Sequence, residues 1–200
     1  MILGLDHLSL NTKDKKNFKK NFFQYNKVYE EYAPNHKEKK LFLYKRIKNH
    51  HIGFYSIKKN LPPIEKTYYG IRKFSANNIK VKKNKFFLSV LSIKQESVFW
   101  GKVFNLDEKK NIINFYSFYD QKKYKFHLNE NYNGKEYLDY IGYTSLCFVS
   151  SDINKVFKSC KDFNIEISKI FNYEMNRKKM KIFFFRSPGG IIFEIVQYLL

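Results

Sequence analysis

The chain has 200 residues, of which 44% are hydrophobic and 19% aromatic, enough for one or two folded domains with a true core. Its formal net charge of +20 comes mostly from Lys spread along the sequence, which is typical of a solvated surface; we expect no nucleic-acid partner, although an anionic small molecule is compatible with the charge. No apolar run reaches the roughly 20 residues of a membrane-spanning helix and the start does not resemble a signal peptide, so we predict a cytoplasmic protein with no membrane partner.

The first 70 residues follow the order β-α-β-β-β. Residues 3–11 alternate like a half-buried strand, and Thr12 can cap a helix after it. The apolar stripe of that helix would be Phe18, Phe22 and Tyr25, and strand-like runs follow at 28–32, 41–47, 52–57 and around Glu65. We therefore predict a first module at 1–70, followed by a basic, polar linker at 71–85.

Two further units follow the linker. The middle unit, 86–139, is divergent: its predicted elements are a strand at 86–93, a helix at 96–106 and strands at 112–118 and 124–128, with no identifiable fourth strand. The last unit, 140–200, repeats the full pattern, with strands at 140–149, 167–173, 180–185 and around Glu194, and a helix opened by Ser150-Ser151-Asp152. Residues 86–200 are also a candidate for one domain of two paired modules.

Glu194 is the most unusual residue of the last unit. Two apolar runs flank the turn Pro188-Gly189-Gly190 and predict a β-hairpin, and Glu194 is the carboxylate in its second strand. A charge on a covered sheet face must be neutralised, paired or bound to a cation. Residues 52–69 have the same pattern of strand, turn and strand with a Glu, and Tyr69 follows Glu65 by four residues as Tyr198 follows Glu194. These similarities indicate an internal repeat.

Four segments together resemble one known family: Leu5-Asp6-His7-Leu8-Ser9-Leu10, Pro63-Ile64-Glu65, 142–152 and 187–197. They look like the glyoxalase, bleomycin-resistance and extradiol-dioxygenase superfamily, also called vicinal oxygen chelate proteins. The resemblance implies an α+β fold in which repeated β-α-β-β-β modules form cupped mixed sheets, with helices on the outside. It also implies a divalent metal ion in the cup (Zn, Fe, Ni, Co or Mn) and a small-molecule substrate.

The resemblance places metal ligands on the first and last strands of each module. They would be His7 and Glu65 in the first unit, and Tyr143 and Glu194 in the last, although Tyr143 stands where many relatives have His or Gln. No ligand is expected in the middle unit. The residues expected around the substrate are Tyr143, Tyr69, Tyr198 and His51.

The sequence leaves the pairing of the units open. The middle and last units can form one cup while the first completes another across a homodimer, or the first and last units can pair directly. The second arrangement gathers His7, Glu65 and Glu194 into one site. A homodimer is our prediction for the assembly.

The leading functional hypothesis is a metal-dependent lyase or isomerase that acts through an enolate or enediolate, with Glu194 moving the proton. The alternatives are a metal-free binding protein of the antibiotic-resistance type, an extradiol-type dioxygenase, and an inactive scaffold. In structural readings of the same residues, His7 is a hydrogen-bonded strand histidine, Glu65 pairs with a nearby Lys, and Glu194 pairs with Arg186. The pair His50-His51 is not a metal clamp, because neighbouring strand residues point to opposite faces.

Overall fold

A computed structural model describes residues 1–13, 25–34, 42–43, 49–57, 62–68, 75, 77–106 and 111–199, with backbone alone for residues 25–34, 49–51 and 56–57. The predicted helix with Phe18 and Phe22 lies outside the described residues, as do Tyr69 and most of the predicted strand 41–47. Tyr25, predicted on that helix, is instead the first residue of a strand.

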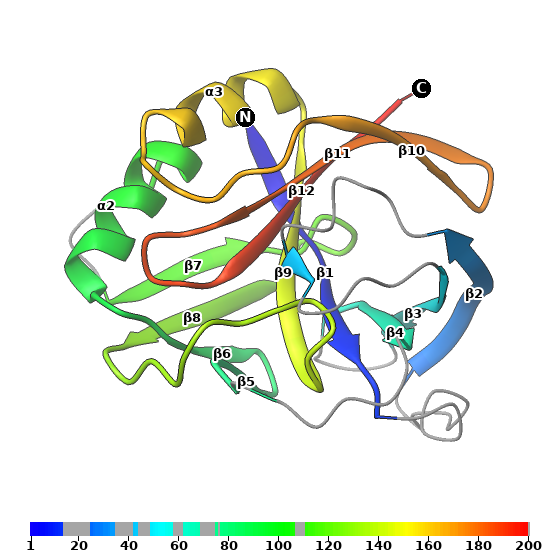
Figure 1. The fold of residues 1–200 in the computed structure, drawn as a ribbon, viewed down its shortest axis with the longest axis horizontal. Helices are drawn as coiled ribbons and strands as arrows, with labels where there is room; N and C mark the ends of the chain where they lie inside the picture. Colours follow the sequence, from blue (N-terminus) through cyan, green and yellow to red (C-terminus); the bar gives the residue numbers. More distant parts are fainter. Residues whose placement is uncertain are drawn as a thin grey trace.

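The larger sheet has eight strands in the order β10-β11-β12-β9-β1-β4-β3-β2 (Figure 1). Their bounds are β1 Ile2–Asn11, β2 Tyr25–Pro34, β3 Asn49–Ile57, β4 Ile64–Tyr68, β9 Gly142–Ser150, β10 Phe171–Met175, β11 Lys178–Arg186 and β12 Ile192–Tyr198. β1 and β9 pair antiparallel at its centre, while β4 lies parallel to β1 and β12 lies parallel to β9. The first and last units therefore join directly into one sheet, and β11 and β12 form the expected hairpin.

The middle unit forms a separate sheet of four strands in the order β5-β6-β8-β7. Its elements are β5 Ile79–Lys82, β6 Lys85–Ser89, α2 Ile93–Phe104, β7 Ile112–Tyr116 and β8 Lys123–Asn129. The strand that the sequence did not reveal is β5, which lies inside the predicted linker 71–85. Ile79 is buried in this strand, and Lys83 takes a φ of 55° in the tight turn to β6. β5 lies at the edge of its sheet, where alternating Lys residues are common because they face solvent.

An aromatic core fills the space between the two sheets and two helices, α2 and α3 (Ile153–Lys161). Trp100 of α2 is fully buried at its centre, with ring contacts to Phe126 of β8 and Phe193 of β12. Phe193 belongs to the back face of the larger sheet, so its neighbour Glu194 points to the opposite face, the inside of the cup. The α+β fold of cupped mixed sheets is thus confirmed, whereas the module boundaries stay a prediction.

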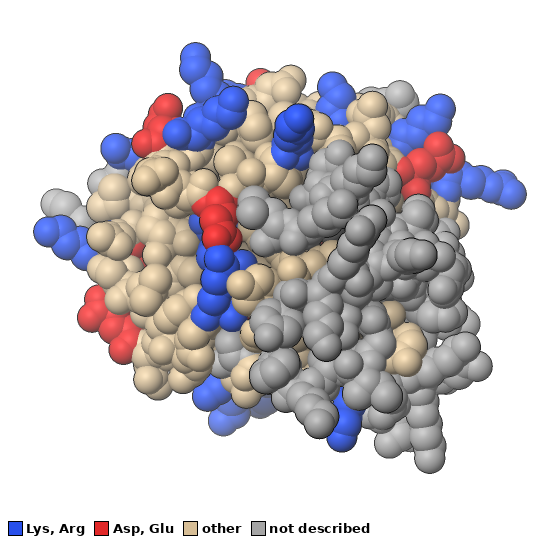
Figure 2. All heavy atoms as spheres, in the orientation of Figure 1, with Lys and Arg blue, Asp and Glu red and all other residues tan. Residues whose placement is uncertain are grey.

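The molecular surface carries its basic residues in a dispersed arrangement. On the face drawn in Figure 2, Lys and Arg side chains are spread over the described surface with Asp and Glu among them. No helix in the described part of the chain is long and apolar enough to cross a membrane.

Candidate metal centre

Strand pairing brings His7, Glu65 and Glu194 together inside the cup. His7 lies opposite Cys147 on β9, and Cys147 is in turn the parallel partner of Glu194 on β12. On the other side of β1, Ser9 is the parallel partner of Glu65 on β4. The Nε2 atom of His7 lies 3.7 Å from Oε2 of Glu65 and 3.8 Å from Oε2 of Glu194. One ligand atom from each residue lies within 4.8 Å of the other two.

The three side chains are largely withdrawn from solvent. The side chains of His7 and Glu194 are each 7% exposed and that of Glu65 is 13% exposed. Burial lowers the pKa of His7, but the hydrogen bond to Asp6 and the charges of Glu65, Asp6 and Glu194 together outweigh it and raise the pKa to about 9. Without a metal ion, His7 is therefore an imidazolium at neutral pH.

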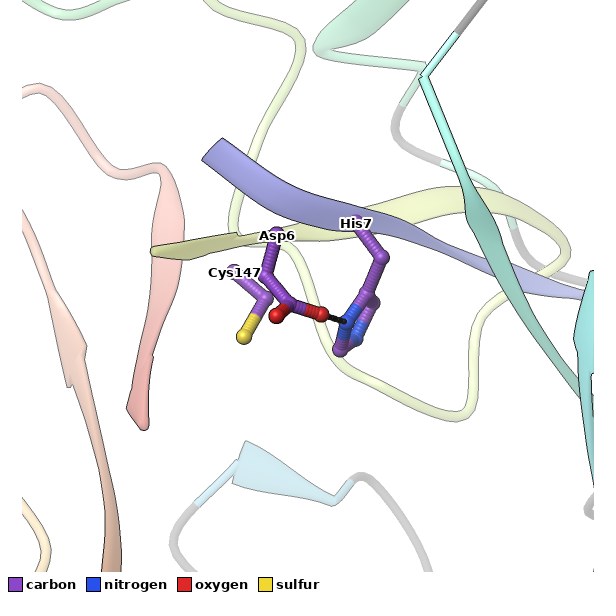
Figure 3. Close-up of side chains that lie close together, drawn as sticks. All are labelled: Asp6, His7 and Cys147. Atoms are coloured by element: carbon purple, nitrogen blue, oxygen red, sulfur yellow. Dashed lines mark hydrogen bonds and ion pairs between the residues drawn. The ribbon is translucent and has the colours of Figure 1, made fainter. Parts of the chain in front are cut away.

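Asp6 holds the His7 ring in place. A register shift between Leu5 and His7 marks a bulge in β1, and Asp6 projects into the cup although it is the immediate neighbour of His7. Oδ1 of Asp6 lies 2.7 Å from Nδ1 of His7, the contact dashed in Figure 3. Oδ2 accepts hydrogen bonds from the hydroxyls of Tyr119 (2.9 Å) and Tyr198 (2.8 Å). A hydrogen on Nδ1 leaves Nε2 of the neutral ring free to act as a ligand.

The donors fit a divalent transition metal. His7 Nε2 is buried and makes no hydrogen bond to any described residue, and its distances to the two carboxylates exceed a hydrogen bond. Ligands held about 2.0–2.2 Å from a tetrahedral ion are roughly 3.3–3.6 Å apart, close to the spacing found here. One imidazole and two carboxylates suit Zn, Fe, Co, Ni or Mn. Three protein ligands are also the number that a catalytic zinc site uses, with a further position open.

Ser145, and not Tyr143, occupies the position in the last unit that corresponds to His7. Ser9 pairs with Glu65 in the first unit, and Cys147 pairs with Glu194 in the same way in the last unit. His7 lies two residues before Ser9 and Ser145 lies two residues before Cys147, so His7 and Ser145 occupy corresponding positions. Oγ of Ser145 is buried and has no hydrogen-bond partner among the described residues.

Tyr143 lies outside the site. A second register shift, between Ser9 and Leu10, interrupts the pairing of β1 with β9, and Tyr143 packs with Leu10, Tyr55 and Ile64. Burial raises the pKa of its phenol and keeps it neutral. Tyr143 is not among the described residues that line the cavity of His7 and Glu194, and its role as a ligand or in the substrate pocket stays a prediction.

The other predicted residues fall in several places. Tyr198 lines the cavity of His7 and the two glutamates, whereas the side chain of His51 and all of Tyr69 lie outside the described residues; a substrate-binding role for these three residues stays a prediction. Arg186, the partner considered for Glu194, donates from Nε to Oε2 of Glu166 at 2.9 Å.

The structure adds four residues that sequence reasoning missed: Asp6, Tyr119, Ser145 and Cys147. Asp6, His7 and Cys147 lie close together in Figure 3, and the buried thiol of Cys147 forms a second potential ligand group with the other two side chains. Only Ser145 had a sequence signal. It precedes Asp152, the cap of α3, by seven residues, as His7 precedes Asp14 in the first unit.

Comparison with known proteins gives distant structural similarities. No family model matches the chain, and no curated protein matches it closely. Among solved structures, it resembles glyoxalase I from Zea mays (15% identity, 97% of this chain and 67% of that one, TM-score 0.41). It also resembles methylmalonyl-CoA epimerase from Mycobacterium tuberculosis (12% identity, 100% and 90%, TM-score 0.48). A third is an integron cassette protein from the mobile metagenome of V. cholerae (20% identity, 64% and 99%, TM-score 0.39).

Proposed function

We propose that the chain is a metal-dependent enzyme that acts on a small molecule as a lyase or isomerase, through an enolate or enediolate. The observation that supports it is the buried Nε2 of His7, which makes no hydrogen bond to any described residue and faces carboxylate oxygens of Glu65 and Glu194 at 3.7 and 3.8 Å. A core histidine with a purely structural role would be expected to use both ring nitrogens in hydrogen bonds.

Each residue of the site has a role in this proposal. A bound divalent ion would act as a Lewis acid on a substrate oxygen and so stabilise the charge of an enolate. His7, Glu65 and Glu194 would hold the ion. Glu194 is also our candidate for the carboxylate that accepts and returns the proton, because it lies in the cavity beside His7. Asp6 keeps the imidazole oriented, so Nε2 stays directed at the two glutamates.

The proposal is tested by measuring metal binding and its effect on the melting temperature. Chelator-treated protein is titrated with Zn²⁺, Mn²⁺, Co²⁺, Ni²⁺ or Fe²⁺ while melting temperature and metal content are measured. The proposal expects one ion per chain and a rise in melting temperature that is lost in His7→Ala. A titration in which none of these ions binds, or in which His7→Ala binds as well as the unchanged chain, would refute it.

A metal-free binding protein is the second candidate, and the pKa of His7 favours it. An imidazolium attracts both Glu65 and Glu194 and offsets part of their negative charge without a metal ion. In that case the chelator-treated protein would melt at the same temperature as untreated protein, and added metal would have no effect. The extradiol-type dioxygenase is less favoured, because among the described residues His7 is the one histidine in either potential ligand group.

A further inference from the structure

A much larger cavity adjoins the candidate metal centre. It measures about 490 Å³ and is formed by the β7–β8 connection, the start of β11 and the end of β12. Its lining residues are Phe118, Tyr119, Arg177, Lys178, Lys179, Tyr198 and Leu199. We propose that this outer cavity binds an organic anion with a flat, aromatic or conjugated body. The binding of such an anion in the outer cavity does not depend on the proposed function. The further idea that the anion is the substrate of the metal centre rests on that function.

The relative sizes of the two cavities separate their roles. The inner cavity, where His7, Glu65 and Glu194 meet, has a volume of about 30 Å³. A cavity of this kind needs about 10–15 Å³ to hold one water molecule, so this space can take an ion or one or two water molecules and is too small for an organic molecule. The outer cavity lies within the roughly 300–1,000 Å³ of small-molecule sites. An organic ligand therefore fits outside the inner cavity, with Tyr198 lining both spaces.

Aromatic rings give the outer cavity an apolar wall. The ring of Phe118 stacks on that of Tyr198 with centroids 6.2 Å apart and an angle of 24° between the planes. The ring of Tyr119 meets Phe118 edge to face at 5.3 Å. Tyr119 is 49% exposed, so a large part of this aromatic surface remains open to a ligand. Flat rings favour stacked or edge-to-face contacts with a flat partner.

Three consecutive cations select the charge of the ligand. Arg177 ends the tight turn between β10 and β11 with a φ of 61°, and Lys178 and Lys179 begin β11. Nζ of Lys178 lies 5.8 Å from the centre of the Tyr198 ring, so a cation stands over the aromatic wall itself. Glu174 is the cross-strand partner of Lys179, which leaves Arg177 and Lys178 as the uncompensated pair by register. Among the described residues, none of those that line the cavity is acidic.

The wall of the outer cavity is linked to the metal centre by hydrogen bonds. The hydroxyls of Tyr119 and Tyr198 both donate to Asp6, which holds His7. A ligand that stacks on Tyr198 therefore lies one side chain away from the residue that orients His7. Both tyrosines line the outer cavity, and their hydroxyls bind Asp6, which lines the inner one.

The experiment uses phenyl phosphate as the probe, with inorganic phosphate and phenol as its two halves. Binding to chelator-treated protein is measured by calorimetry, so that phosphate cannot report on a metal ion. We expect phenyl phosphate to bind at least 10-fold more tightly than either half. The double variant Arg177→Gln/Lys178→Gln should weaken it at least 10-fold, and Lys158→Gln, which removes an exposed charge from α3, should leave it unchanged. Each variant is first checked for an unchanged melting temperature.

The outcomes separate this inference from the proposed function. Equal binding of phenol and phenyl phosphate, no binding of phenyl phosphate, or equal losses in the double variant and Lys158→Gln would overturn the inference. None of these results depends on metal binding by His7, Glu65 and Glu194. Conversely, a failed metal titration would remove the proposed enzyme and leave the anion cavity standing.

Discussion

The substitution Glu194→Gln tests whether the buried carboxylate serves a metal ion or an ion pair. It keeps the shape of the side chain and removes one charge. At 3.8 Å and an effective dielectric constant of about 20, the attraction between Glu194 and the His7 imidazolium is about 4 kcal/mol. Glu65 lies within 4.8 Å and repels Glu194 by at least about 3 kcal/mol on the same scale. The two effects nearly cancel, so the metal-free variant should change in stability by about 1 kcal/mol or less.

The metal-bound state should respond much more strongly. A divalent cation carries two charges and lies in direct contact with both carboxylates, so the attraction lost with one of them outweighs the repulsion between Glu65 and Glu194 that the substitution relieves. We expect the affinity to fall at least about 100-fold, or roughly 2.7 kcal/mol. At a metal concentration that stabilises the unchanged chain by about 2.7 kcal/mol, the variant would then gain about 0.4 kcal/mol.

The assay measures melting temperature with and without metal, together with metal content, for the unchanged chain and the variant. Glu166→Gln is the matched control, because it removes the same charge from the partner of Arg186 outside the cup. The reasoning is refuted if metal-free Glu194→Gln loses 3 kcal/mol or more while its metal content stays that of the unchanged chain. That result would make Glu194 the structural partner of an imidazolium.

Three further predictions concern other residues. Asp6→Asn removes the negative charge and one of the two acceptor oxygens, so the side chain can no longer accept hydrogen bonds from both His7 and the two tyrosines. Metal affinity in the same titration should fall about 10- to 100-fold, and an unchanged affinity would exclude a positioning role. Gly4→Ala would place its Cβ 2.8 Å from the backbone oxygen of Tyr116, and we expect a loss of about 1–3 kcal/mol in denaturant unfolding, whereas unchanged stability would contradict the close contact. Burial raises the pKa of Glu136 to about 7, although hydrogen bonds from Asn78 and the charge of Arg186 oppose the rise. Because the neutral carboxyl is favoured in the folded state, the stability that it contributes is full below about pH 4.5 and is lost as the pH rises through 7. Glu136→Gln should flatten that fall, of up to about 3 kcal/mol, and an identical pH profile in the variant would disprove the assignment.

The repeat and the elements around Glu194 were accessible from the sequence because they depend on local patterns. Alternation predicted β1, runs of apolar residues predicted β9 and β12, and the Pro-Gly-Gly turn predicted the β11–β12 hairpin. The unusual carboxylate in an apolar strand identified Glu194 through the cost of burying a charge. Its nearness to His7 needed the pairing of β1 with β9, which joins residues far apart in the chain.

The errors have a common physical origin in strand register. A regular strand alternates its side chains, and that rule assigns Asp6 and His7 to opposite faces and Tyr143 to the same face as Ser145. Bulges between β1 and β9 break the rule in both places. A bulge depends on how two strands pair, so the sequence of one strand does not reveal it.

The same pairing explains why the candidate site is asymmetric. In the first unit the two corresponding positions hold His7 and Glu65, whereas the last unit has Ser145 and Glu194. A neutral serine hydroxyl is a much weaker metal ligand than imidazole, so the last unit supplies one strong donor and the site has three. Three donors leave room in the coordination shell for oxygens of a substrate, which is the condition for Lewis-acid catalysis and not for a closed structural site. Serine in place of a second imidazole at position 145 therefore lowers the expected affinity for the ion without removing the chemistry that His7, Glu65 and Glu194 can support.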